Sequence, residues 1–358
     1  MNLTNVPSPS QARGDFLNAI TCGPPGRVPY CESHFSRKHM ADLLGSHVLG
    51  EYPTGPIPAL RTSPEWSFEI ACKLGIGFVT TSSIWELGRI YDTNEEGEFV
   101  YVGGSLRTID DLRIADRPPF EPILQRLERF VSLGRRYGQA VGFGVYSPFT
   151  IGQLAMGVDH LCLALYDDMD LVMAILDAAV GFYVPLIESA LDIGMDFLQV
   201  SSAICFGMGS ICNPDLTRRL WRPGMEAYLE PVRRRGIPIG FHSDGDNTVF
   251  VEDFISVGAA YLHPIEPCSG RFDIYKTQEK VAGRLALCGN IDLAGVLSRG
   301  TPREVRRDVG EHIRRLGPAG GYLCGSSHEI SDSVPPENFE AMVQAIHDFG
   351  ARYSEPTQ

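Results

Sequence analysis

Eight short apolar runs, each ending in polar residues, recur along this chain and limit the folds open to it. Amphipathic stretches with helical spacing separate them, as at residues 120–137 and 302–316. Strands that alternate with helices pair in parallel, and eight such units in 358 residues predict an α/β fold, a (β/α)₈ TIM barrel. A doubly wound sheet is the alternative. The predicted strands are residues 27–32, 76–81, 141–146, 195–200, 237–241, 260–263, 285–288 and 321–324.

One segment breaks the alternation. Residues 89–101 read as a strand, a polar turn with Asn94 and Gly97, and a second strand. This pattern predicts a β-hairpin inserted after the second barrel strand. The hairpin either covers part of the barrel mouth or is a plain surface feature.

The chain length leaves one or two domains open. We predict an N-terminal extension at residues 1–25 and a single barrel domain at residues 26–353. The net charge of −13 argues against nucleic acid or an anionic membrane as a partner. Nine cysteines without a CxxC pair indicate reduced thiols and a cytoplasmic protein. The most apolar stretch, residues 171–187, contains Asp177 and Pro185, so no membrane span is predicted.

Polar residues that follow the predicted strands should meet at one end of the barrel, where such folds carry their active sites. The second half of the chain supplies most of the groups that bind metals or move protons. Two imidazoles and two carboxylates there suit a divalent transition metal. A hydrogen-bonded polar rim without a metal is the alternative. The four predicted ligands are His242, Asp244, Glu266 and His328.

The remaining strand ends carry predicted substrate-binding residues. Glu32 and His34 could form an acid/base pair at the mouth, or His34 could be an ordinary surface imidazole. Ser201 could hydrogen-bond a polar substrate, and Tyr146 ends its strand nearby.

Four ordered motifs resemble the uroporphyrinogen decarboxylase superfamily, which includes cobalamin-linked methyltransferases. The superfamily folds as a (β/α)₈ barrel, in agreement with the alternation above. Asn290 and Asp292 match its Gly-Asn-x-Asp motif, which implies either substrate or ligand orientation or strand-end capping. The motifs are IGFHSDGD at 239–246, HPIEP at 263–267, RLALCGNID at 284–292 and SSHEISDSVPPENFEAM at 326–342.

The resemblance also implies a metal site. The methyltransferase branch binds zinc through His-x-Cys-Gly, then Glu, then Cys. His242 falls on the His of this pattern and Asp244 on its first Cys. His328, ten residues before Asn338, falls at the place of the last Cys, where the decarboxylases have a His. We therefore expect Zn²⁺, or alternatively iron, manganese or cobalt, in a shell without sulfur, unless Cys324 replaces His328 as a ligand.

The first half of the chain departs from the decarboxylases. They bind a tetra-anionic porphyrinogen through an Arg-rich segment after the first strand and an Asp after the second. Here the first segment has Glu32 at its centre, and residues 79–85 contain no carboxylate. Porphyrinogen decarboxylation is therefore not expected.

The leading hypothesis is a metal-dependent methyltransferase that moves a methyl group to or from a thiol or a corrinoid on a partner protein. Asp244, Glu266 and His328 are its predicted catalytic residues, and the substrate is a small molecule. A metal-dependent lyase, decarboxylase or hydrolase acting on a small carboxylated substrate is the alternative. A non-catalytic tetrapyrrole or metal-binding protein is the second one. The resemblance alone implies a homodimer.

Overall fold

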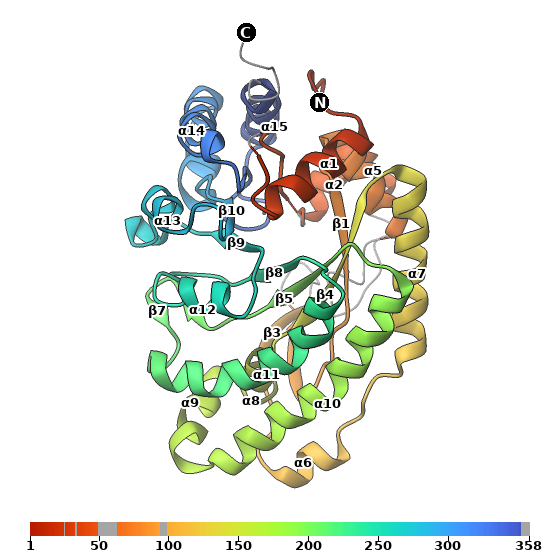
Figure 1. Cartoon of the computed structure of the whole chain (residues 1–358), viewed down its shortest axis with the longest axis vertical. Coiled ribbons are helices and arrows are strands. Elements are labelled where there is room, and N and C mark those ends of the chain that lie inside the picture. The colour runs from red at the N-terminus through yellow and green to blue at the C-terminus, as the bar shows by residue number, and fades with distance from the viewer. Residues whose placement is uncertain (25, 33, 49–62, 94–98, 352–358) are drawn as a thin grey trace.

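A curled, all-parallel sheet forms the centre of the protein, with helices outside it (Figure 1). The computed structural model describes residues 1–24, 26–32, 34–48, 63–93 and 99–351. Neighbouring strands of the sheet pair in the order β1-β4-β5-β8-β9-β10-β11. The predicted alternation of strands and helices is confirmed as a TIM-barrel-like fold. The strands are β1 (Phe78–Ser82), β4 (Ala140–Tyr146), β5 (Phe197–Ser201), β8 (Ile239–His242), β9 (Tyr261–Ile265), β10 (Ala286–Gly289) and β11 (Tyr322–Leu323).

The first predicted strand, residues 27–32, does not form a full strand, and only Tyr30 within it makes isolated β-bridges. Tyr30 pairs in parallel with Ile76, just before β1, and with Cys324, just after β11. Cys31 N–H donates to the Cys324 carbonyl, and Cys324 N–H donates to the Pro29 carbonyl. This segment therefore joins the two edges of the sheet. Pro29 has no N–H to donate, which limits the ladder on that side.

Aromatic side chains fill the amino end of the barrel. Helix α1 (Pro9–Ile20) lies across it, and its Phe16 stacks on Phe78 with ring centroids 4.3 Å apart. Phe16 also contacts Phe197 and Tyr261, which stand at the starts of β5 and β9. Residues of the predicted N-terminal extension thus form the floor of the barrel, although the predicted domain boundary itself stays a prediction.

Helices follow the strands and bury their apolar faces against the sheet. Asn213 and Thr301, each followed by proline, cap α11 (Pro214–Arg234) and α14 (Pro302–Leu316) as the sequence predicts. The other α-helices outside the sheet are α2 (Arg37–Leu44), α5 (Pro64–Leu74), α6 (Ile109–Ile114), α7 (Phe120–Tyr137), α8 (Pro148–Met156), α9 (Val158–Asp167), α10 (Met169–Ile193), α12 (Val251–Ser256), α13 (Ile274–Val281) and α15 (Pro336–Gly350).

The predicted hairpin is present after β1, the second position in the barrel. Strands β2 (Arg89–Thr93) and β3 (Phe99–Gly104) pair antiparallel and pack on α8. The predicted turn residues Asn94 and Gly97 lie outside the described residues. A smaller antiparallel pair, β6 (Cys205–Phe206) and β7 (Gly209–Ser210), follows β5.

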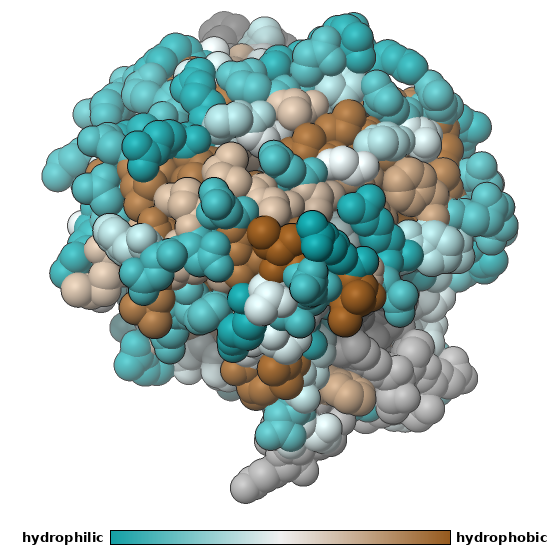
Figure 2. Space-filling view, turned by 90° about the horizontal axis from the view of Figure 1, so that it is seen from below, coloured by the Kyte–Doolittle hydropathy of each residue, from teal (hydrophilic) through white to brown (hydrophobic). Residues whose placement is uncertain are grey.

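Helix α10 is long and apolar enough to cross a membrane, and the bent pair α8–α9 passes the same test only when counted as one span. Half of the most apolar window of α10 is buried, and the helix packs against α7, α8 and α11. Core helices of globular proteins share this composition. Figure 2 shows apolar side chains gathered between polar ones on the face seen from below. Exposed apolar residues on α9 and α10 include Leu163, Tyr166 and Met173.

Candidate functional site

Two imidazoles and one carboxylate converge at the carboxyl ends of the barrel strands. His242 ends β8, Asp244 follows two residues later, and His328 follows β11. His242 Nε2 lies 3.2 Å from Asp244 Oδ1, and His328 Nε2 lies 3.4 Å from the same oxygen. Three of the four predicted ligands are therefore brought together, and we call His242, Asp244 and His328 the outer site.

A buried amide fixes the loop that carries Asp244. The Asn247 side-chain amide donates to the carbonyls of Ser243, Asp244 and Gly245 at 2.8, 3.1 and 3.1 Å. Gly245 has a φ of +78°, and a Cβ there would lie 2.2 Å from the Phe206 carbonyl. The turn therefore requires glycine at this position. Asn247 did not stand out in the sequence, because an Asn after a strand is common in turns.

The groups of the outer site shift one another's pKa values in opposite directions. Burial alone would raise the pKa of Asp244, but the two imidazoles hold it well below its ordinary value. The contact with Asp244 raises the pKa of His328 to about 9, against the opposing effect of burial. Without a cation, His328 and Asp244 therefore form an ion pair at neutral pH.

A divalent cation fits the outer site. Asp244 Oδ1 is buried and is approached by the two imidazole nitrogens at 3.2 and 3.4 Å. Without an ion the protonated His328 balances the charge of this carboxylate, and a divalent ion held by the same three atoms can take the place of that proton. Imidazole nitrogen and carboxylate oxygen are ordinary ligands of zinc and related transition ions.

Glu266, the fourth predicted ligand, lies beside the outer site but not within it. It directly follows β9, and its carboxylate accepts a hydrogen bond from the Gly245 N–H. Burial raises its pKa, and the charge of Asp244 acts in the same direction. The ligand atoms of the other three lie within 4.8 Å of one another, and this close group does not include Glu266.

His263 is a buried residue of the site that the sequence reasoning missed. It lies on β9 in register with His242 on β8. The two Nδ1 atoms are 3.0 Å apart and share a hydrogen bond. Burial holds the pKa of His263 well below its ordinary value, so its ring is neutral. The signal available in the sequence was its place near the end of a strand, inside the HPIEP motif.

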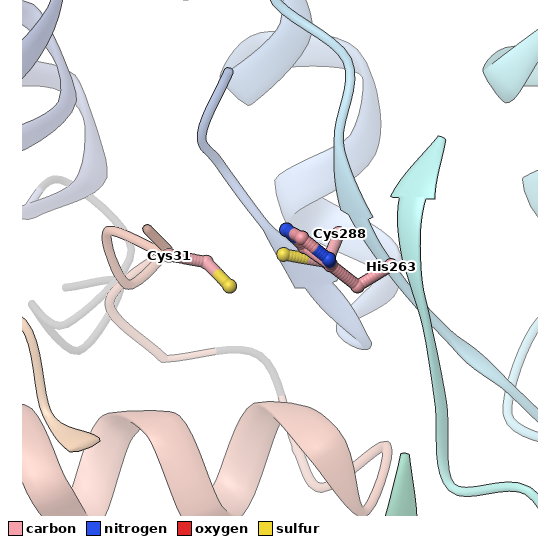
Figure 3. Close-up of side chains that lie close together, drawn as sticks. All are labelled: Cys31, His263 and Cys288. Atoms are coloured by element: carbon pink, nitrogen blue, oxygen red, sulfur yellow. The ribbon is translucent and has the colours of Figure 1, made fainter. Parts of the chain in front are cut away.

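A second group of ligand-type side chains lies in the barrel interior and includes His263. Cys31, His263 and Cys288 are all buried, and their ligand atoms lie within 4.8 Å of one another. Figure 3 shows their side chains gathered in the barrel interior, with Cys31 facing the other two. We call this group the inner cluster. Thiolate and imidazole are a donor set for zinc.

A cavity of about 150 Å³ opens beside the outer site. Three of the predicted substrate-binding residues contribute to its wall, namely His34, Tyr146 and Ser201. His242, His263 and His328 line it as well. Its wall contains Glu329, but no lysine or arginine among the described residues. A small substrate of low negative charge suits this cavity.

Comparison with known proteins identifies the family. Residues 85–349 match the uroporphyrinogen decarboxylase (URO-D) family. The chain belongs to this family. The resemblance inferred from the four motifs is therefore confirmed.

Relatives in the family are distant. A uroporphyrinogen decarboxylase from Pseudomonas fluorescens (strain SBW25) is 22% identical over 361 residues, covering 95% of this chain and 98% of that protein. One from Legionella pneumophila (strain Corby) is 35% identical over 81 residues, 23% of this chain and 22% of that protein. A methyltransferase from Methanosarcina mazei has a TM-score of 0.71 at 18% identity, covering 94% and 98% of the two chains. At this identity the structural likeness establishes the fold.

Glu32 is buried and does not line the cavity. Its carboxyl accepts a hydrogen bond from Ser326 Oγ at 2.7 Å, and burial raises its pKa to about 8. It is therefore a protonated acid at neutral pH. It does not line the cavity with His34, so its predicted substrate contact stays a prediction.

Asn290 and Asp292 hold backbone in place. The Asn290 side-chain amide donates to the Ile265 carbonyl at 2.8 Å, and its oxygen lies 3.3 Å from His312 Nε2. Asp292 accepts from the Gly295 N–H at the start of a short helical turn. Neither lines the cavity. These contacts match the capping alternative, and their substrate role stays a prediction.

Cys324, the proposed substitute for His328, is buried beside β11. It is not among the groups that converge with His242 and Asp244 within 4.8 Å, whereas His328 is. The geometry therefore favours His328.

Proposed function

We propose that this protein is a metal-dependent methyltransferase that moves a methyl group between a small substrate and a thiol or corrinoid acceptor. One observation carries the proposal. Two imidazole nitrogens and a buried carboxylate oxygen converge at the strand ends beside a small cavity. Zn²⁺ is the first choice of ion, and Glu266, which accepts a hydrogen bond from the Gly245 N–H next to Asp244, is the proposed fourth ligand.

The chain's own residues have separate tasks in this proposal. A divalent ion held by the outer site would supply a Lewis acid for activating the methyl acceptor or polarising the donor. Glu266 would add a second carboxylate to the ligands of that ion. The Tyr146 and Ser201 hydroxyls at the cavity wall can orient a polar substrate.

The character of the cavity supports a small substrate over a porphyrinogen. Four carboxylates would need cationic partners, and the described lining residues include no lysine or arginine. A corrinoid would therefore be carried by a separate protein. We also propose a cytoplasmic location, no nucleic-acid or membrane partner and a homodimer.

Metal analysis tests the ion site. We expect zinc or another transition metal in the purified full-length chain, and a drop of about one equivalent per chain in the His242→Ala and His328→Ala variants. His160→Ala is the matched control, since His160 is on α9, away from the strand ends. Equal metal content in all four proteins would remove the outer site from consideration.

A spectral assay tests methyl transfer itself. The spectrum of added methylcobalamin should change to that of demethylated cobalamin in the presence of the enzyme and a thiol acceptor. In the other direction, the spectrum of added, pre-reduced cob(I)alamin should change to that of methylcobalamin in the presence of the enzyme and a methoxylated donor. His328→Ala should abolish this change, and His160→Ala should not. An unchanged spectrum across a panel of small thiols and donors would exclude methyl transfer to or from the corrinoid.

A lyase is the second candidate, and the ionisation of His328 favours it. When no ion is bound, the pKa of about 9 means that this imidazole carries a proton at neutral pH at the edge of the cavity. Such a group can protonate the carbanion left when a small carboxylate loses carbon dioxide. Carbon dioxide release from small carboxylic acids, lost in His328→Gln, is the test that separates this reaction from methyl transfer.

A further inference from the structure

The inner cluster brings sulfur and nitrogen donors from separate parts of the sheet to one buried point (Figure 3). Cys288 lies on β10, His263 on β9, and Cys31 directly after the bridge residue Tyr30. Their exposed fractions are 0%, 5% and 4%. The outer site does not use the two thiols, so they need an explanation of their own.

A disulfide does not suit the two cysteines. Strand β11 runs between them, because β10 pairs with β11 and Tyr30 pairs with Cys324 at the end of β11. Two strand spacings put their Cα atoms about 9 Å apart. A disulfide needs Cα atoms within about 7 Å, so the backbone would have to move.

An ion can bridge the same side chains with smaller movements. Ligand atoms around tetrahedral zinc lie about 3.5–3.8 Å apart, given Zn–S and Zn–N bonds of about 2.3 and 2.0 Å. The three ligand atoms already lie within 4.8 Å of one another. Side-chain rotations that move each cysteine sulfur by about one ångström or less would bring the three atoms to the spacing of zinc ligands.

We propose that Cys31, His263 and Cys288 form a second, inner metal site that takes a soft d¹⁰ cation such as Zn²⁺ or Cd²⁺. Sulfur donors select softer ions than the imidazole and carboxylate donors of the outer site do. The inner site does not depend on His242, Asp244 or His328 for its ligands. It therefore stands apart from the proposed function and can be tested separately.

Cobalt substitution in the metal-depleted, reduced chain tests the proposal. Added Co²⁺ should give a thiolate-to-cobalt charge-transfer band in the near ultraviolet. The band should be lost in Cys31→Ala and Cys288→Ala and kept in Cys324→Ala, a matched control at a buried cysteine beside β11. It should also be kept in His242→Ala. Absence of the band in the wild-type chain, or its persistence in both cluster variants, would overturn the inner site.

Cadmium-113 NMR of the wild-type chain gives an answer that needs no variant to fold. One equivalent of Cd²⁺ should give a resonance in the downfield range of sulfur ligation. A resonance only in the range of oxygen and nitrogen ligation would exclude the inner site while supporting the outer one. A sulfur-shifted resonance together with unaltered metal binding in His242→Ala and His328→Ala would support the inner site and exclude the outer one.

Discussion

At the scale of single residues, the geometry of the outer site depends on a side chain that is not one of its proposed ligands. Asn247 is fully buried and donates to three carbonyls of the loop that carries Asp244. A strand end alone positions His242, but Asp244 lies beyond the strand and needs this support. Asn247 is therefore a positioning residue.

Asn247→Ala should lower the free energy of unfolding by about 2 kcal/mol, because it leaves buried carbonyls without donors. It should also weaken metal binding at the outer site by about tenfold, because Asp244 loses its fixed position. Asn338→Ala is the matched control, since that buried amide holds carbonyls of Leu297 and Gly300 instead. Urea unfolding and calorimetric metal titration measure the two effects. Equal metal affinity in both variants would show that the loop keeps its shape without Asn247.

A buried imidazole elsewhere gives the protein an acid-sensitive contact. His347 on α15 donates from Nε2 to the carbonyl of Leu74, the last residue of α5, at 3.0 Å. Burial lowers its pKa to about 4, with Arg27 acting in the same direction and the Leu74 contact and Asp348 opposing it. The folded chain thus keeps this ring neutral where the unfolded chain would protonate it.

Stability should therefore fall as the pH drops from about 6.5 to about 4, because only the unfolded state takes up the proton in this window. The contribution of His347 to that loss is about 3 kcal/mol. His347→Gln, which can still donate to Leu74, should flatten this part of the curve of unfolding free energy against pH. Parallel curves for the wild-type chain and the variant would show that His347 does not titrate in this range.

At the scale of elements, helix α1 closes the end of the barrel opposite the outer site. Phe16 inserts among Phe78, Phe197 and Tyr261 at the amino ends of three strands. Glycines on neighbouring strands leave room for these rings, since a Cβ at Gly240 would lie 2.0 Å from the Tyr261 ring. The N-terminal helix is thus part of the barrel's core packing.

Phe16→Ala should lower the free energy of unfolding by about 3–5 kcal/mol, the usual cost of emptying a buried aromatic site. Phe16→Leu should cost much less, because it fills most of the volume. The outer site should keep its affinity for Mn²⁺ in any Phe16→Ala protein that remains folded, since the floor lies at the other end of the strands. Thermal unfolding and manganese binding followed by electron paramagnetic resonance check both. Loss of manganese binding in folded protein would show that the floor also sets the geometry of the mouth.

The elements also show what the sequence can and cannot predict. Alternating apolar runs predict seven of the eight strands, and the rule that active sites lie at strand ends predicts the meeting of His242, Asp244 and His328. The first run gives only bridges at Tyr30, because its pairing partners are fixed by closure of the sheet. Closure is a long-range property, and it also brings Cys31 to Cys288 across β11.

His263 was missed for a related reason. Whether a strand residue faces the barrel interior depends on register, and a slip of one residue turns its side chain to the opposite face. The sequence does not settle the register of β9 against β8, whereas the structure pairs His242 with His263. Glu266 follows His263 closely in the sequence but stands beside the outer site without joining it.

At the scale of the whole molecule, the contact between His242 and His263 links the two proposed metal sites. Their Nδ1 atoms are 3.0 Å apart, so one ring donates the shared proton and the other accepts it. A neutral imidazole that binds metal through Nε2 carries its proton on Nδ1. If both rings bound metals in this way, two N–H groups would face each other at this short distance.

Occupancy of the inner site should therefore weaken the outer one. Losing the shared hydrogen bond costs about 1–3 kcal/mol, so Mn²⁺ should bind the cadmium-loaded chain about tenfold or more weakly than the unloaded chain. Manganese suits this test because it prefers oxygen and nitrogen ligands over the thiolates of the inner site. In His263→Gln the facing imidazole is gone, so one equivalent of Cd²⁺ held by the two cysteines should leave the Mn²⁺ affinity unchanged. Titrations followed by electron paramagnetic resonance measure all four states, and equal Mn²⁺ affinity in loaded and unloaded wild-type protein would mean that the two sites fill independently.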